Sequence, residues 1–155
     1  MKRKIGLLSV MFFIFDFISK LIINKFLVLG KSYPLLNEFL YVTKAYNTGV
    51  SFGFLQGYKT IIILINIAIL IFLYLYMQKF KANKRNILAF GMVFGGLFGN
   101  LFNRIFYGYV IDFIDFYIVN YNFPIFNFAD IFICLGIFLL LYAIFLGEDN
   151  ESKSK

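Results

Sequence analysis

The chain has 155 residues, of which 61% are hydrophobic and 15% charged, and its mean hydropathy is +0.82. A soluble core of this length cannot hold so much apolar surface, so we expect a membrane protein. The formal charge of +7 does not indicate nucleic-acid binding, because the cations cluster beside apolar runs. The single cysteine, Cys134, and the absence of histidine exclude an intrachain disulfide, a zinc site and a His-based triad.

Four apolar stretches follow one another along the chain, at residues 5–23, about 58–77, 87–106 and 126–146. Each approaches the ~20 residues that a helix needs to cross a bilayer, and a lipid environment favours helix because the backbone must satisfy its own hydrogen bonds. The first stretch begins like a secretory signal, but no small-residue cleavage site follows, so we expect an uncleaved anchor. The sequence predicts a single membrane domain over residues 1–155.

Basic clusters at residues 2–4, 79–85 and 153–155 predict that both termini and the middle connection are cytoplasmic. Two segments then face outward, at residues 24–57 and 107–125. Within the first of these, residues 39–46 are rich in β-branched and aromatic side chains, which predicts a short strand or two at the membrane surface.

Four carboxylates lie in or against the apolar stretches: Asp16, Asp112, Asp115 and Asp130. Acidic groups near hydrocarbon are costly and therefore indicate function. Asp112 follows the third span and Asp130 lies about one turn inside the fourth, so the hairpin of these spans brings both to the same depth. Two carboxyl groups in a partly dry site share one proton, which suits amide hydrolysis. The same pair is also compatible with a path for protons or cations.

Amide and guanidinium side chains extend this polar set along the helices. Asn100, Asn103 and Arg104 are three and four residues apart and should share one face, and Asn127 shares a face with Asp130. We expect these side chains to approach the carboxyl pair from neighbouring helices.

Two further patterns concern helix packing. Lys20 follows Asp16 by four residues, which predicts an ion pair on one helix face, with direct substrate contact by Asp16 as the equal alternative. Gly91, Gly95 and Gly99 form a stripe of small residues that predicts close packing against another helix.

Five short motifs occur in order along nearly the whole chain: DFISK at 16–20, NTGVSFG at 47–53, GGLFGNLFNR at 95–104, GYVIDF at 108–113 and FNFAD at 126–130. Together they resemble the motifs of lipoprotein signal peptidase (signal peptidase II), a family of aspartic membrane peptidases. The chain departs from that pattern at Asn103, where an Asp is usual, and at Ser51, where an Ala is usual.

The resemblance implies an all-α integral membrane protein with four transmembrane helices. A small extracytoplasmic β-sheet or cradle and a surface loop or short helix are expected in addition. It implies an endopeptidase of the bacterial cytoplasmic (inner) membrane that cleaves prolipoproteins before a diacylglyceryl-modified cysteine, with its active site toward the extracytoplasmic face. Asp112 and Asp130 match the catalytic dyad. Polar positions around the dyad are matched by Asp16, Lys20, Asn47, Asn100, Arg104 and Asn127. No cofactor or metal is implied, the partners are prolipoprotein signal peptides and membrane lipids, and the chain is expected to be a monomer.

Three other functions are compatible with parts of the pattern. A small four-helix transporter coupled to protons or cations would use Asp16 as its embedded carboxylate. A serine–lysine peptidase is disfavoured because Ser19 and Lys20 point about 100° apart on a helix. A structural or assembly protein would leave the five ordered motifs unexplained.

Overall fold

The computed structural model describes residues 1–36, 39–49, 55–118 and 121–149. In this part of the chain, four helices are long and apolar enough to cross a membrane. They are α1 (Lys2–Phe26), α2 (Lys59–Tyr76), α3 (Lys84–Phe106) and α4 (Phe128–Phe145), and a short 3₁₀ helix, η2 (Met77–Lys79), extends α2. These helices lie over the four apolar stretches of the sequence, and each begins or ends within three residues of the expected bounds.

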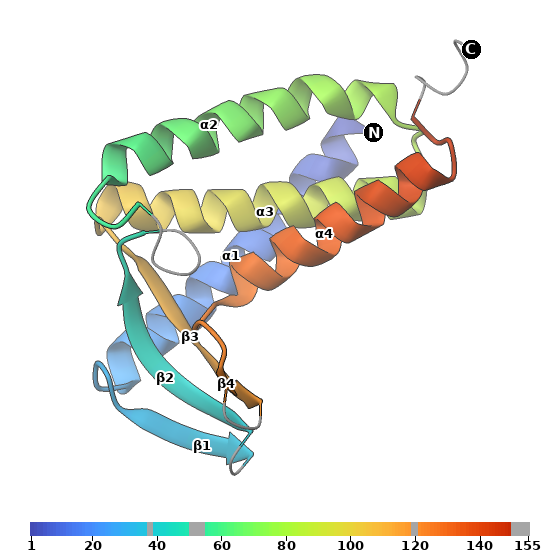
Figure 1. Cartoon of the computed structure of the whole chain (residues 1–155). Helices are drawn as coiled ribbons and strands as arrows, with labels where there is room; N and C mark the ends of the chain where they lie inside the picture. The colour runs from blue at the N-terminus through green and yellow to red at the C-terminus, as the bar shows by residue number, and fades with distance from the viewer. Residues whose placement is uncertain (37–38, 50–54, 119–120, 150–155) are drawn as a thin grey trace.

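Helix α3 lies at the centre of the bundle, between α1, α2 and α4 (Figure 1). In its most apolar window 78% of the residues are buried, against 22% in each of the other three helices, so most of the lipid-facing surface belongs to α1, α2 and α4. Glycines allow this close contact: a Cβ on Gly91 would lie 2.6 Å from Leu8 Cβ, and one on Gly95 would lie 2.8 Å from the Ser9 carbonyl oxygen. The predicted packing role of the glycine stripe is confirmed.

An antiparallel sheet accompanies the helices, with the strand order β1 (Ser32–Leu36), β2 (Leu40–Asn47), β3 (Val110–Ile118) and β4 (Tyr121–Asn122). The fold is therefore mostly helical with a small sheet, as expected, but it is not purely all-α. The strands expected in residues 24–57 are present, but β3 and β4 form where only an outer connection was expected. Their cause is local, because residues 110–118 read VIDFIDFYI and are dominated by β-branched and aromatic side chains. The surface loop or short helix is untested at residues 50–54, which lie outside the described residues.

Strand β3 is fixed on both sides. On one side it pairs with β2, where Ala45 lies opposite Asp112 and Asn47 lies opposite Val110. On the other side the backbone N–H groups of Phe113 and Ile114 donate to the Phe126 carbonyl oxygen at 2.9 and 2.8 Å, just before α4 begins. The strand is thereby held between β2 and the segment that leads into α4.

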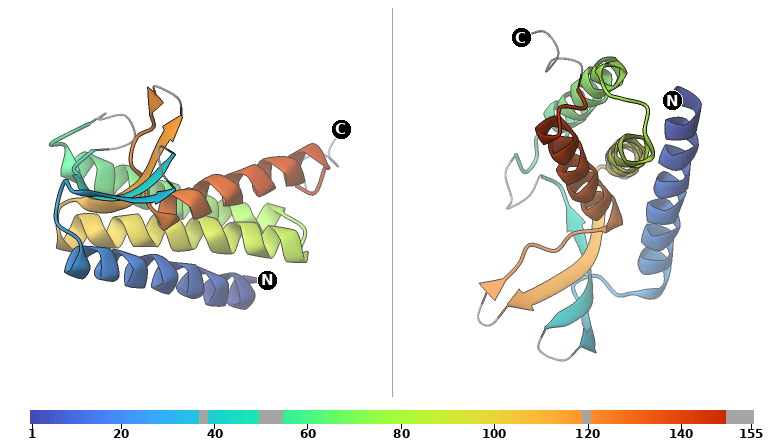
Figure 2. Two further views of the ribbon diagram at one scale, coloured as in Figure 1. Left: turned by 90° about the horizontal axis from the view of Figure 1, so that it is seen from below. Right: turned by 90° about the vertical axis from the view of Figure 1, so that its right-hand side faces the viewer.

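The bundle has two distinct ends (Figures 1 and 2). The N-terminus, the connection between α2 and α3 and the last turn of α4 lie at one end, and the sheet lies at the other. The basic segments 2–4 and 79–85 are therefore gathered away from the sheet. Arg85 and Asn83 there contact the Glu148 carboxylate at 2.5 and 2.6 Å, closing this end of the bundle.

Candidate active site

Two carboxyl groups meet where strand β3 approaches the start of helix α4. Asp112 is the third residue of β3 and is only 3% exposed, and Asp130 is half-buried in the first turn of α4. From the sequence, we expect a hairpin of the third and fourth spans to bring both acids to one depth. In the structure, Asp112 is carried by a strand rather than by the end of a span. A strand holds the side chain in an extended backbone with hydrogen bonds on both sides, which limits its freedom.

Asn127 joins the two carboxyl groups. Its side-chain Nδ2 donates to Asp112 Oδ1 at 2.6 Å, and its backbone N–H donates to Asp130 Oδ2 at 3.1 Å. Its Oδ1 in turn accepts from the Asp130 backbone N–H at 3.1 Å, which completes a capping box at the start of α4. A single residue, Asn127, thus forms hydrogen bonds with both acids, which are 18 positions apart in sequence.

The remaining carboxylate oxygens each accept a hydrogen bond from another amide. Asn47, at the end of β2, donates from Nδ2 to Asp112 Oδ2 at 2.9 Å, and Asn100 of α3 donates from Nδ2 to Asp130 Oδ1 at 2.8 Å. Every oxygen of the pair therefore has a donor, and the four donors come from three residues, Asn47, Asn100 and Asn127. Such preorganised donors hold both side chains in position before any substrate arrives.

Burial is the largest cause that raises the pKa of Asp112 from 3.8 to about 7, and the nearby charge of Asp130 acts in the same direction. The hydrogen bonds from Asn127 and Asn47, and the Lys20 ammonium, oppose this rise because they favour the ionised form. Asp112 is therefore about half protonated near neutral pH. A proton is available within the pair at the pH where a hydrolase of this kind would work.

A buried ion pair supports the site from helix α1. Lys20 Nζ lies 2.7 Å from Asp16 Oδ2 and donates to Asn100 Oδ1 at 3.0 Å, so it orients the amide that holds Asp130. Asp16 Oδ1 accepts from the Ala129 backbone N–H at 2.9 Å, which ties α1 to the first turn of α4. Asp16 is completely buried, so the ion-pair interpretation holds and direct substrate contact is not supported.

Arg104 lies in the last turn of α3 and connects the site to the turn that follows β2. Its Nη2 donates to the Gly49 carbonyl oxygen at 2.8 Å, and its charge attracts both carboxylates of the pair. The Gly49 N–H donates to Asn47 Oδ1 at 2.9 Å, so this turn and the amide that contacts Asp112 are positioned together. Ser51 lies just beyond, outside the described residues.

Asn103 and Asp115 lie outside this network. Asn103 was expected to share a face with Asn100 and Arg104, but its Oδ1 accepts from the Ile111 backbone N–H at 3.2 Å, and so it fixes the start of β3. Asp115 contacts the Thr43 hydroxyl, 2.6 Å from Oδ2, and so ties β3 to β2. The Thr43 contact could not be found from sequence, because it depends on the β2–β3 register.

The neighbouring serine and lysine of α1 are engaged separately. Ser19 Oγ donates to the Asp16 carbonyl oxygen at 2.6 Å, and Lys20 Nζ is held by Asp16 and Asn100. No nucleophile–base pair forms between Ser19 and Lys20, which agrees with the angular argument from sequence. Among the described residues there is also no group of three or more acidic or cysteine side chains that could hold a metal ion.

A comparison with protein families matches residues 8–146 to the family model described as Signal peptidase (SPase) II. The chain belongs to the signal peptidase II family. It is 33% identical over 141 residues to a lipoprotein signal peptidase of Bacillus subtilis (strain 168), covering 90% of this chain and 92% of that protein. It is 34% identical over 138 residues to a lipoprotein signal peptidase of Halalkalibacterium halodurans, covering 88% of both.

Solved structures of bacterial membrane enzymes share the fold. One, described as a bacterial membrane enzyme determined at 2.3 Å resolution, superposes with a TM-score of 0.84 at 35% identity, covering 97% of this chain and 91% of the other. A second bacterial membrane enzyme, at 1.9 Å, has a TM-score of 0.80 at 37% identity and covers 90% and 91%. The family and the apolar helices together indicate a bacterial membrane protein that is a peptidase, and they give no support to the transporter alternative.

Proposed function

We propose that the chain is a lipoprotein signal peptidase, an aspartic endopeptidase that removes signal peptides from prolipoproteins before a diacylglyceryl-modified cysteine. Family membership supports the removal of signal peptides from prolipoproteins. The finer parts of the proposal are the aspartic mechanism, the lipid on the substrate cysteine and the identity of the catalytic pair as Asp112 and Asp130.

The reaction needs two proton transfers, and two carboxyl groups supply both. The ionised carboxylate takes a proton from a water molecule, whose oxygen attacks the scissile carbonyl carbon. The protonated carboxyl group gives its proton to the amide nitrogen as the C–N bond breaks, which leaves a free carboxylate on the signal peptide and a free amino group on the lipidated cysteine. The pair ends with one proton, which came from the water molecule and is now on the other carboxyl group.

The observation that carries this proposal is the Asn127 bridge between Asp112 and Asp130. Because one amide side chain and its own backbone contact both acids, the two carboxyl groups are close and are oriented by fixed donors. The pKa of Asp112, about 7, makes a proton available within the pair near neutral pH. Cleavage needs such a proton for the leaving amide nitrogen.

The decisive experiment compares the wild type with Asp112→Asn and Asp130→Asn on a diacylglyceryl-modified prolipoprotein in detergent micelles or vesicles. Each variant should lose cleavage by a factor of about 10³ or more, because each removes one of the two proton transfers. Asp115→Asn is a matched control: it is a buried acid on the same strand, three residues from Asp112, whose described contact is Thr43. It should retain most of the wild-type rate.

Retained cleavage by either of the first two variants would remove that residue from the dyad. Equal losses in all three would mean that the assay responds to disruption of β3 rather than to chemistry. A substrate whose cysteine carries no diacylglyceryl group should be cleaved far more slowly; equal rates on both substrates would contradict the lipid requirement.

The remaining parts of the proposal concern placement. We infer one membrane domain, monomeric, with both termini in the cytoplasm, because basic segments 2–4 and 79–85 lie at the end of the bundle opposite the sheet. The dyad then lies at the extracytoplasmic boundary, where a lipid-anchored substrate arrives laterally from the bilayer. A fluorescent protein fused to the C-terminus should fold and fluoresce in the cytoplasm; a dark fusion at normal expression would reverse the orientation.

A further inference from the structure

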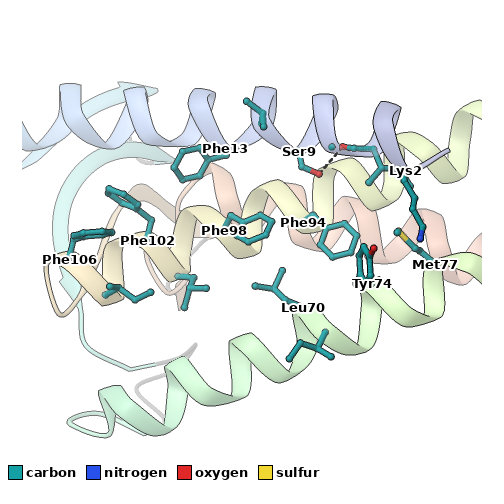
Figure 3. A pocket seen from close by; sticks show the side chains of 16 residues that line it. Lys2, Ser9, Phe13, Leu70, Tyr74, Met77, Phe94, Phe98, Phe102 and Phe106 are labelled. Carbon is teal, nitrogen blue, oxygen red and sulfur yellow. Dashed lines mark hydrogen bonds between the residues drawn. The ribbon is translucent and has the colours of Figure 1, made fainter.

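A long apolar groove runs along the bundle between α1, α2 and α3, and it is separate from the dyad. Its volume is about 740 Å³. None of the residues of the dyad or of its hydrogen-bond network lines it, among those that the structure describes. Figure 3 shows Phe102 and Phe106 toward one end of the groove, Phe98 near its middle, and Lys2 with Met77 at the other end.

The groove exists because α2 stands away from α1 while both contact α3. Small residues on α1 widen it: Gly6 lines the groove, and a Cβ built on Gly6 would meet no atom within 4 Å. Ser9, one of the few polar side chains in the lining, donates its hydroxyl proton to the Ile5 carbonyl oxygen at 2.8 Å and so offers no free donor. Only an apolar occupant fits such a lining.

The size of the groove distinguishes between apolar occupants. A 20-residue transmembrane helix is about 30 Å long and 10 Å across, a cylinder of about 2,400 Å³, so only part of it could enter a groove of about 740 Å³. An alkyl chain is much narrower, since its carbons need only about 4 Å to neighbouring atoms. The groove therefore fits lipid chains better than the helix of a signal peptide or of a second copy.

The charge at one mouth of the groove indicates which lipid. Among the described residues that line it, Lys2 is the one that is charged, and its ammonium lies 5.2 Å from the centre of the Tyr74 ring. Lys2 and Met77 also line an adjoining cavity of about 300 Å³, together with Gln78 and Ala82. An apolar groove that ends at a lysine, next to a second, smaller cavity, matches a lipid with an acyl chain and an anionic headgroup.

We propose that this groove is a binding site for an anionic phospholipid, with an acyl chain between α1, α2 and α3 and the headgroup phosphate at Lys2. The bound chain fills the space that separates α2 from α1 and supports α2 on that side. The basic end of the bundle supplies the charge, so the lipid belongs to the leaflet on the side of residues 2–4 and 79–85.

The test measures retained lipid by native mass spectrometry after reconstitution into vesicles of phosphatidylglycerol and phosphatidylcholine in equal amounts, followed by mild detergent extraction. The wild type should retain phosphatidylglycerol in preference to phosphatidylcholine. Lys2→Gln should lower the retained phosphatidylglycerol about fivefold, as expected for one lysine at a phosphate. Lys4→Gln, an exposed lysine on the same turn outside the groove, is the matched charge control and should behave as the wild type.

A second pair of variants tests the chain-binding part. Gly6→Leu places a side chain in the groove from a position where a Cβ meets no atom within 4 Å, and it raises helix propensity, so the protein should fold and lose both lipids. Leu7→Phe adds bulk to an exposed neighbour outside the groove and should retain them. Equal retention by all variants, equal retention of both lipids by the wild type, or full retention by Gly6→Leu would each overturn the proposal, as would a dimer mass in place of lipid adducts.

Discussion

Replacing Asp112 by Asn should abolish cleavage and at the same time make the protein more stable at alkaline pH. The folded protein holds the pKa of Asp112 at about 7, against 3.8 for the ordinary carboxyl group. Between these values the folded state binds more protons than the unfolded state, so wild-type stability falls as pH rises from about 4 to about 7 and stays lowered above that. A difference of about three pKa units corresponds to about 4 kcal/mol.

An opposing effect accompanies the substitution. Asn47 and Asn127 both point amide donors at Asp112, so an Asn at this position must turn one of its own N–H groups toward a donor. We expect that mismatch to cost about 1–3 kcal/mol at every pH. The Asp112→Asn variant should therefore be less stable than the wild type near pH 4.5 and more stable by about 1–3 kcal/mol near pH 8.

The assay is unfolding in mixed micelles, titrated with sodium dodecyl sulfate and followed by far-ultraviolet circular dichroism at pH 4.5, 6, 7 and 8. The other titratable groups are common to both proteins and largely cancel in the difference between them. If the free energy of unfolding of Asp112→Asn relative to the wild type does not change across this range, the assignment of a buried, protonated Asp112 is refuted. If the variant gains stability relative to the wild type toward acid pH instead, the pKa of Asp112 is lowered rather than raised in the folded protein.

Three further outcomes are expected. Asn103→Asp keeps an oxygen for the Ile111 N–H and should retain cleavage. Asn103→Leu leaves that donor unpaired and should lower the free energy of unfolding by about 1–3 kcal/mol in the same assay. Equal stability of the two variants would contradict the role of Asn103 at the start of β3. Gly99→Ala should destabilise the protein by about 1–3 kcal/mol, because its Cβ would clash with Asp16 Oδ2, and Gly6→Ala should not; a neutral Gly99→Ala would show that α1 can move away from α3. Cleavage should be unchanged by EDTA, because the two carboxyl groups supply both proton transfers; loss of activity restored by a divalent cation would argue against a metal-free mechanism.

The sequence predicted those parts of the site that depend on short-range spacing. Asp16 and Lys20 are four residues apart on one helix, and they form the expected ion pair. Asn127 and Asp130 are three apart, and their common face became a capping box. The lengths of the apolar runs predicted the helices, because the thickness of a bilayer fixes how many consecutive apolar residues a spanning helix needs.

The parts that were not predicted depend on contacts between distant segments. Spacing placed Asn103 with Asn100, yet its side chain turns to the Ile111 N–H, because the chain reverses there into β3. Strand β3 itself was missed, since its pairing with β2 joins residues 63 to 76 positions apart. The contact of Lys20 with Asn100 joins residues 80 positions apart and could not be read from either helix alone.

The capping box at the head of α4 gives one carboxylate two duties. Asp130 both secures the first turn of its helix through Asn127 and belongs to the pair proposed to cut the peptide. A substitution of Asp130 that abolishes catalysis therefore also removes a hydrogen bond of the N-terminal cap of α4. Selection on catalysis and selection on folding therefore act on the same atoms, and neither property can drift at this position without the other.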